Sequence, residues 1–79
     1  MTEIDYKQAR REIMSYIAKQ DKTSLKQACT DAGVSYTSIY NQTRGIQLVN
    51  VYKIREFIEK INEKFTAVEV DGKLIITRR

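Results

Sequence analysis

One short stretch of the chain, residues 36–44, carries side chains that can bind the edges of nucleic-acid bases. Tyr36, Thr37, Tyr40, Asn41 and Arg44 recur at spacings that place them on one outward face of a helix. Together they can donate and accept hydrogen bonds, stack on rings and touch methyl groups. Asparagine can pair with adenine through two hydrogen bonds, and an aromatic ring can contact a thymine methyl group. We therefore expect base contacts from Tyr36, Thr37, Tyr40 and Asn41.

Phosphate contacts are expected beside this face. Lys26 and Arg44 supply positive charge, and Arg44 at the helix end suits a phosphate better than a base. Ser35 and Ser38 lie at the start of the same helix, where free backbone N–H groups attract an anion. We therefore predict phosphate contacts at these four residues.

Two short helices joined by a tight turn must position these side chains. We expect them over residues 25–32 and 36–44, with Gly33 supplying the left-handed backbone at the turn. Ser24 and Ser35 are suited to cap the two helices through their hydroxyl groups. This arrangement is a helix-turn-helix, which typically places its second helix in the major groove of DNA.

The inner side of the same stretch is suited to packing. Gln27, three residues after Ser24, predicts a capping box of the Ser-x-x-Gln type. Small or apolar residues fall where two crossing helices must meet: Leu25, Cys29, Ala32, Val34 and Ile39.

Longer elements flank the two short helices. Apolar periodicity predicts helices over residues 3–20 and 51–64, with Thr2 and Asp5 as candidate caps of the first. An Asp-Gly pair at 71–72 predicts a two-residue β-hairpin over residues 66–77. Its register pairs residues 70 with 73, 68 with 75 and 66 with 77. The fold class is thus mainly α with a small β part: four helices followed by a C-terminal two-stranded hairpin, in a single domain over residues 1–79.

The hairpin carries apolar residues on both faces. A lone two-stranded ribbon is marginal in water, so one face should pack on the helices. The other face, or an open strand edge, should meet a second copy of the chain. We expect this dimer interface to draw on five residues: Val68, Val70, Leu74, Ile75 and Ile76.

The segment from Ser24 to Ile54 resembles the Cro/repressor (XRE-type) helix-turn-helix family. The resemblance rests on residues 28–35, Ile39 and the Arg44-Gly45 pair, and the hairpin resembles the dimer-forming ribbon of small phage Cro repressors. It implies a dimer that reads operator half-sites about one helical turn apart, ~34 Å. The chain departs from the family where that family has a phosphate-binding glutamine, here Leu25. It also departs near the end of the second helix, where Gln42 and Thr43 replace an apolar residue and a glutamate, weakening a core contact and an ion pair.

Composition bounds the function further. The 79 residues include 14 Lys and Arg against 10 Asp and Glu, a net charge of +4 that suits a polyanion. The chain has no histidine and one cysteine, Cys29, so we expect neither a catalytic site nor a metal or cofactor. It has no apolar run of membrane-spanning length and no signal peptide, which favours a cytoplasmic protein without a membrane partner. The resemblance to phage repressors further implies a bacterial cell and association with the nucleoid. We see no ligand-sensing domain, so we expect no small-molecule partner.

The leading hypothesis is a sequence-specific regulator of transcription, a phage or mobile-element repressor that binds double-stranded DNA as a homodimer. Two alternatives remain open. One is an excisionase-like or partition-type DNA-binding protein. The other is an antirepressor-like module that uses the helix-turn-helix to hold a protein. The absent phosphate-binding glutamine leaves room for it, as do Tyr36 and Tyr40, since two tyrosines are unusual on the base-reading face of the family.

Overall fold

The computed structural model describes residues 3–79 and has four helices followed by a two-stranded antiparallel hairpin. The protein is therefore mainly helical with a small β part, as the sequence predicts. The elements in chain order are α1 (Tyr6–Lys19), α2 (Leu25–Ala32), α3 (Tyr36–Thr43), α4 (Val51–Ile61), β1 (Phe65–Val70) and β2 (Lys73–Arg78).

Each helix begins at a polar residue whose side chain accepts a backbone N–H, which satisfies donors that have no partner within the helix. Asp5, Ser24, Ser35 and Asn50 fill this role for α1 to α4, respectively. The expected capping box at Ser24 is only half formed, because the Gln27 side chain donates to Asp31 Oδ1 (2.8 Å) rather than turning back to the cap. The other candidate cap of α1, Thr2, lies outside the described residues.

The helix α4 ends three residues earlier than the sequence periodicity predicts. Asn62 is extended (φ −153°, ψ 110°), and its side-chain oxygen accepts the N–H of Lys64 (3.0 Å). Such local asparagine bonds compete with helix and favour turns. Phe65 therefore opens β1 instead of closing α4, although its ring still packs edge-on against Tyr16 with the ring centroids 5.5 Å apart.

The hairpin register is the one expected: Val70 pairs with Lys73, and Val68 pairs with Ile75. Both turn residues, Asp71 (φ 51°) and Gly72 (φ 77°), have the positive φ that the favoured two-residue turn requires. The turn is also anchored to the start of the chain, because Asp5 N–H donates to the Gly72 carbonyl (3.0 Å).

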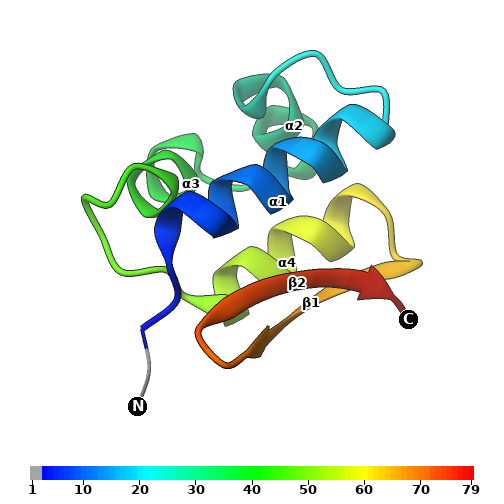
Figure 1. The fold of residues 1–79 in the computed structure, drawn as a ribbon. Helices are drawn as coiled ribbons and strands as arrows, with labels where there is room; N and C mark the ends of the chain where they lie inside the picture. The colour runs from blue at the N-terminus through cyan, green and yellow to red at the C-terminus, as the bar shows by residue number, and fades with distance from the viewer. Residues whose placement is uncertain (1–2) are drawn as a thin grey trace.

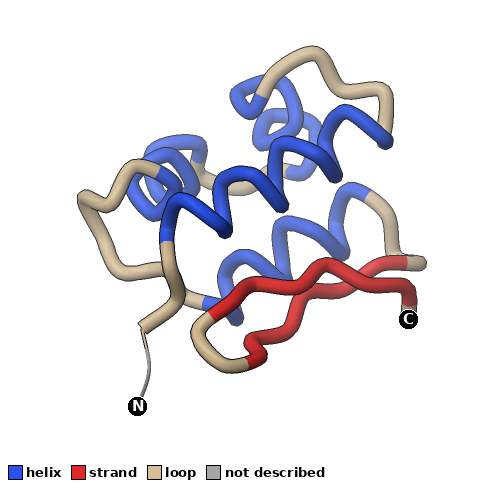
Figure 2. Tube along the Cα trace, viewed as in Figure 1, coloured by secondary structure: helices blue, strands red, loops and turns tan. Residues whose placement is uncertain are grey.

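The molecule is layered (Figures 1 and 2). The helices α1 and α4 lie against the hairpin, α1 along β2 and α4 along β1, and α2 and α3 pack on the far side. The core lies between these layers and contains Ala9, Ile13, Tyr16, Ile17, Ala28, Cys29, Ile39, Ile54, Phe57, Ile58, Ala67 and Leu74. Within residues 3–79, no helix is long and apolar enough to cross a lipid bilayer.

The inward face of the hairpin carries Ala67, Leu74 and Ile76. Ala67 and Leu74 are fully buried, and Ile76 packs against the core. The expectation that Leu74 and Ile76 face a second copy is therefore corrected, because both side chains are used within the protomer. The outward face retains Val68 and Ile75, which are half-buried, and Val70, which is half-exposed.

Helix side chains cover part of both hairpin edges. The Gln8 amide donates to the Leu74 carbonyl (2.7 Å) and accepts the Leu74 N–H (2.8 Å), as a neighbouring strand would. On the other edge, Arg55 Nε donates to the Ala67 carbonyl (2.8 Å). Covered edges resist pairing with another chain, so the outward face is the better-exposed hairpin surface.

Candidate nucleic-acid interface

The turn between α2 and α3 has the geometry that a helix-turn-helix requires. Gly33 adopts the left-handed conformation (φ 70°), and Val34 N–H donates to the Cys29 carbonyl (3.1 Å), which closes the end of α2. Cys29 and Ile39, one on each helix, are buried in the core. Local capping and the packing of these residues thus fix α3 relative to α2.

Along the exposed side of α3 runs a stack of two tyrosines and an arginine. The rings of Tyr36 and Tyr40 are 5.6 Å apart between centroids, and the Arg44 guanidinium carbon lies 5.3 Å from the centre of the Tyr40 ring. The three residues are spaced four apart, so each meets the next one turn along the helix. The stack holds Arg44 over the helix surface and leaves its N–H groups available for a phosphate or base.

The remaining expected base contacts accompany this stack. Thr37 is exposed and Asn41 is half-buried. The Asn41 carbonyl accepts N–H groups from Arg44, Ile46 and Gln47, which anchors the chain after α3. Within residues 3–79 its side-chain amide makes no hydrogen bond, so both of its polar atoms remain available to a base edge.

The structure separates Ser35, which caps α3, and Ser38, in its first turn, from this face. Ser35 Oγ accepts the Ser38 N–H (3.2 Å), and Ser38 Oγ accepts a bond from Gln42 Nε2 (3.3 Å). Both serines line a shallow groove that Lys53 and Glu56 of α4 close from the other side. The four expected phosphate contacts therefore do not form one surface: the serines face α4, whereas Arg44 belongs to the tyrosine stack.

Two cations, Lys26 in the first turn of α2 and Arg44 at the end of α3, are left without an acidic partner among the described residues. Lys22 pairs with Asp31 (2.9 Å), and the hydrogen bonds from Lys22 and Gln27 lower the pKa of the Asp31 carboxyl below its ordinary value. The other ion pair in the described part of the chain joins Glu56 and Lys60. Lys26 and Arg44 therefore keep their positive charges free for an anion.

Two buried polar residues at the end of α3 have a role that the sequence did not reveal. Gln42 and Thr43 are each only 2% exposed. Gln42 Oε1 accepts the Asn50 N–H (2.8 Å), and Thr43 Oγ1 donates to the Tyr40 carbonyl (3.0 Å). No buried side-chain nitrogen or oxygen among residues 3–79 lacks a partner. The two departures from the family were expected to weaken a core contact and an ion pair. Instead, Gln42 ties α3 to the loop that precedes α4, and Thr43 is satisfied within α3.

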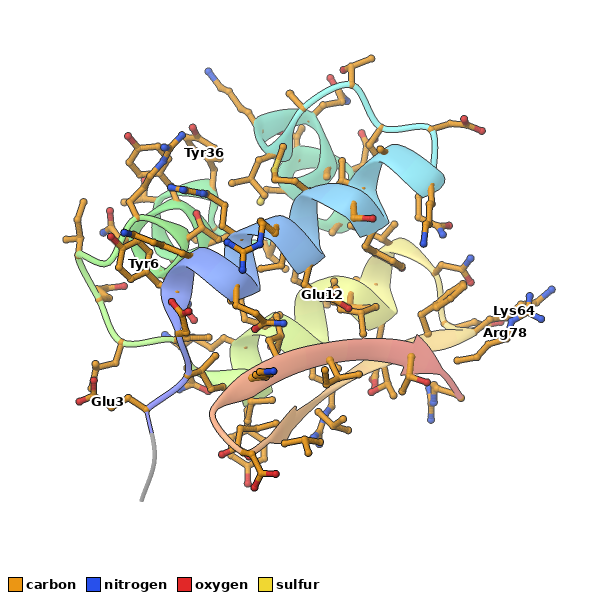
Figure 3. All side chains as sticks on the ribbon, in the orientation of Figure 1. Glu3, Tyr6, Glu12, Tyr36, Lys64 and Arg78 are labelled. Carbon is orange, nitrogen blue, oxygen red and sulfur yellow. The ribbon has the colours of Figure 1, made fainter. Side chains whose placement is uncertain are left out.

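Tyr6 is another residue whose role was not predicted. A Cβ placed on Gly45 would lie 2.8 Å from Tyr6 Cε1, so the tyrosine ring of α1 packs directly on the glycine that follows α3. Figure 3 shows Tyr6 and Tyr36 on the same side of the molecule, with Lys64 and Arg78 at the opposite side. The end of α3 is thus buttressed by α1 as well as by α2.

Other chemistry finds little support in the residues described. Burial raises the pKa of the Cys29 thiol to about 11 and that of the Tyr16 hydroxyl to about 12, so neither is a ready nucleophile or base. In the described chain, no three His, Cys, Asp or Glu residues gather where they could hold a metal ion. Comparison with models of known protein families and with curated protein sequences finds no match.

Proposed function

We propose that this protein binds double-stranded DNA in a sequence-specific manner, with α3 in the major groove, and regulates transcription as a Cro-like repressor. The observation that carries the proposal is the Tyr36–Tyr40–Arg44 stack, beside the free amide of Asn41, on a helix fixed by a capped turn. Tyr36 and Arg44 are exposed, and Tyr40 between them is half-buried. Base-reading positions on the second helix of a helix-turn-helix typically lie on such a face. The unpaired Lys26 and Arg44 add the positive charge that phosphates require.

Binding as a homodimer is part of the proposal. The outward hairpin face, now limited to Val68, Val70 and Ile75, is the surface we assign to the second copy. An interface on this face leaves the inward face undisturbed in the protomer core. It also fixes two α3 helices relative to each other, which reading two half-sites requires.

Selection from random double-stranded DNA tests both parts of the proposal. We expect enriched fragments to share one sequence, with two copies arranged about a two-fold axis. Enrichment of a single asymmetric site would retain DNA reading and reject the dimer. No enrichment over input, at low salt, would reject sequence-specific binding altogether.

The same experiment, followed by footprinting on the source genome, separates the two DNA-binding roles. A footprint over a promoter supports a regulator of transcription. A footprint within a recombination or partition site supports an excisionase-like or partition-type protein. The antirepressor-like alternative predicts no enriched DNA and a stable complex with a repressor protein.

A further inference from the structure

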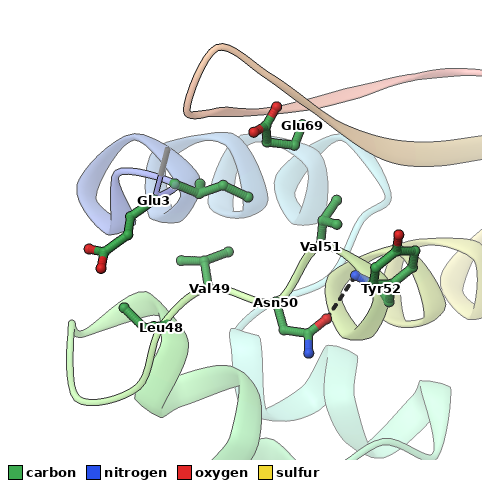
Figure 4. Close-up of a pocket in the computed structure, with 8 residues that line it drawn as sticks. Glu3, Leu48, Val49, Asn50, Val51, Tyr52 and Glu69 are labelled. Atoms are coloured by element: carbon green, nitrogen blue, oxygen red, sulfur yellow. Dashed lines mark hydrogen bonds between the residues drawn. The ribbon is translucent and has the colours of Figure 1, made fainter. Parts of the chain in front are cut away.

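A groove of about 520 Å³ opens where the start of the chain, the loop before α4 and the hairpin meet (Figure 4). Most of its lining is apolar, and the residues come from three separate segments of the chain. The lining consists of Glu3, Ile4, Leu48, Val49, Asn50, Val51, Tyr52 and Glu69. None of these residues belongs to the α3 face described above.

Two side chains at the mouth of this groove are unusually exposed for their type. Leu48 is 71% exposed and Tyr52 is 73% exposed. Tyr52 is nevertheless held in place, because its ring lies against the Arg55 guanidinium (5.5 Å), and Arg55 is itself bonded to β1. Apolar and aromatic side chains that share one concave surface mark an interaction site more often than singly scattered ones do.

The charge of the groove is opposite to that of the whole chain. Although the protein carries +4, the two charged residues among those that line the groove are Glu3 and Glu69. Asn50 also covers the start of α4, since its Oδ1 accepts the N–H groups of Tyr52 (3.0 Å) and Lys53 (3.3 Å). Phosphate is therefore disfavoured here, because the carboxylates repel it and the helix amides already have a partner.

We propose that this groove is a docking site for a segment of a partner protein that carries apolar side chains next to lysine or arginine. The apolar floor takes the former, and Glu3 and Glu69 complement the latter. The open mouth suits a polypeptide better than a small molecule, which its site typically encloses by 70–90%. Glu69 is on the inward side of the hairpin, opposite the Val68–Ile75 pair, so the groove and the proposed dimer surface can be occupied together.

The proposal is tested with a phage-displayed library of random dodecapeptides selected against the folded protein. We expect enriched peptides that combine two or three apolar residues with lysine or arginine. A synthetic peptide of that sequence should lose at least about tenfold in affinity for Leu48→Asp, which places a charge on the apolar wall. Ile46→Asp is the matched control, because Ile46 is equally exposed in the same loop (66%) but does not line the groove.

Glu69→Lys tests the charge term separately. This variant should bind the basic peptide more weakly, and the affinity should depend less on salt, because a cation replaces one of the two attracting carboxylates. The proposal is overturned if no peptide is enriched, if enriched peptides are acidic, or if Leu48→Asp and Ile46→Asp bind the peptide alike. Circular dichroism on each variant excludes unfolding as the cause.

A second copy of the chain is the competing occupant, and sedimentation distinguishes it. If Leu48→Asp converts a dimer to a monomer while Ile46→Asp does not, the groove is the dimer interface and the proposal of a separate partner is rejected. Selection from random DNA with the Leu48→Asp variant distinguishes failure of the docking proposal from failure of the DNA-binding proposal. Peptide docking does not depend on DNA binding, so an unchanged operator preference in this variant, together with abolished peptide binding, supports the groove as an independent site.

Discussion

At the scale of single residues, Gln42 illustrates how a buried polar side chain can hold a loop. Its amide lies between Ser38 of α3 and the backbone of Asn50, so one side chain joins α3 to the residue that caps α4. An apolar residue of similar size would fill the same space without fixing the loop. The arrangement therefore orders the segment between Gly45 and Asn50, which has no secondary structure of its own.

Gln42→Ala should lower the free energy of unfolding by about 2 kcal/mol, because it removes the acceptor of the Asn50 N–H and leaves a gap in the core. Gln47→Ala is the control, since Gln47 is exposed in the same loop and its side chain makes no hydrogen bond within residues 3–79. Urea unfolding of the two variants measures the difference. Equal stabilities would show that the buried amide contributes nothing.

Asn41→Ala should leave stability nearly unchanged but reduce discrimination between the selected DNA site and a scrambled one. A paired asparagine and adenine contribute ~1–3 kcal/mol to discrimination, so the preference should fall by a factor between about 5 and 150. Fluorescence anisotropy with the two DNA duplexes measures this ratio, and Gln47→Ala again serves as the control. A preference equal to that of the unaltered protein would remove Asn41 from the reading face.

The base-reading candidates could be named from the sequence because they follow from helical spacing alone. Tyr36, Tyr40 and Arg44 fall on one side of α3, and the structure keeps them together. The bonding of Gln42 to Asn50 and the packing of Tyr6 on Gly45 could not be predicted. Both depend on how separate elements are placed, and no local pattern encodes that placement.

At the scale of elements, the two glycines beside α2 and α3 have positive φ but different surroundings. Gly33 (φ 70°) has open space where a Cβ would be, whereas a Cβ on Gly45 (φ 77°) would meet the Tyr6 ring. Gly33→Ala should therefore cost only the backbone strain, about 1 kcal/mol. Gly45→Ala should cost more, because the ring must also move.

The Tyr6 contact can be isolated by a double-mutant cycle. In a Tyr6→Ala background the extra destabilisation caused by Gly45→Ala should disappear, since the ring that it displaces is gone. Thermal unfolding of the four proteins in the cycle measures the coupling. Additive effects would mean that the ring yields without cost and that α1 does not buttress the end of α3.

Element boundaries were predictable where a local signal sets them. The bounds of α2, the hairpin register and the caps Asp5, Ser24 and Ser35 follow from short-range chemistry. The predicted end of α4 was wrong, because apolar periodicity continues through Phe65 while Asn62 turns the chain. The sequence also left open which hairpin face points inward, since both faces carry apolar residues. Only tertiary packing determines that Leu74 is buried while Val70 stays half-exposed.

At the scale of the whole molecule, the burial of two ionisable side chains in the core makes the free energy of unfolding sensitive to alkaline pH. Burial raises the pKa of Cys29 from 9.0 to about 11 and that of Tyr16 from 10.0 to about 12. The unfolded chain thus loses these protons at lower pH than the native protein does, so stability is complete below about pH 9 and falls as pH rises toward 11 and 12. The melting temperature should decline across this range, and Cys29→Ala should lessen the decline that begins near pH 9. An identical decline in that variant would assign the effect to other groups.

The stoichiometry on DNA can be derived from the salt dependence of binding by single-charge variants. Removing one phosphate-binding cation lowers the slope of log affinity against log salt by ~0.9, because fewer counterions are released on binding. Lys26→Ala should therefore reduce the slope by ~1 if one copy binds and by ~2 if two equivalent copies bind. Lys64→Ala is the control, since Lys64 lies on the opposite side of the molecule from Tyr36 (Figure 3).

The variant Ile75→Lys, which places a charge on the outward hairpin face, tests whether that face joins the two copies. In its background, the reduction in slope caused by Lys26→Ala should fall from ~2 to ~1, because the copies separate. If Lys26→Ala leaves the slope unchanged, Lys26 does not bind phosphate. If Lys26→Ala still reduces the slope by ~2 in the Ile75→Lys background, the dimer interface lies elsewhere.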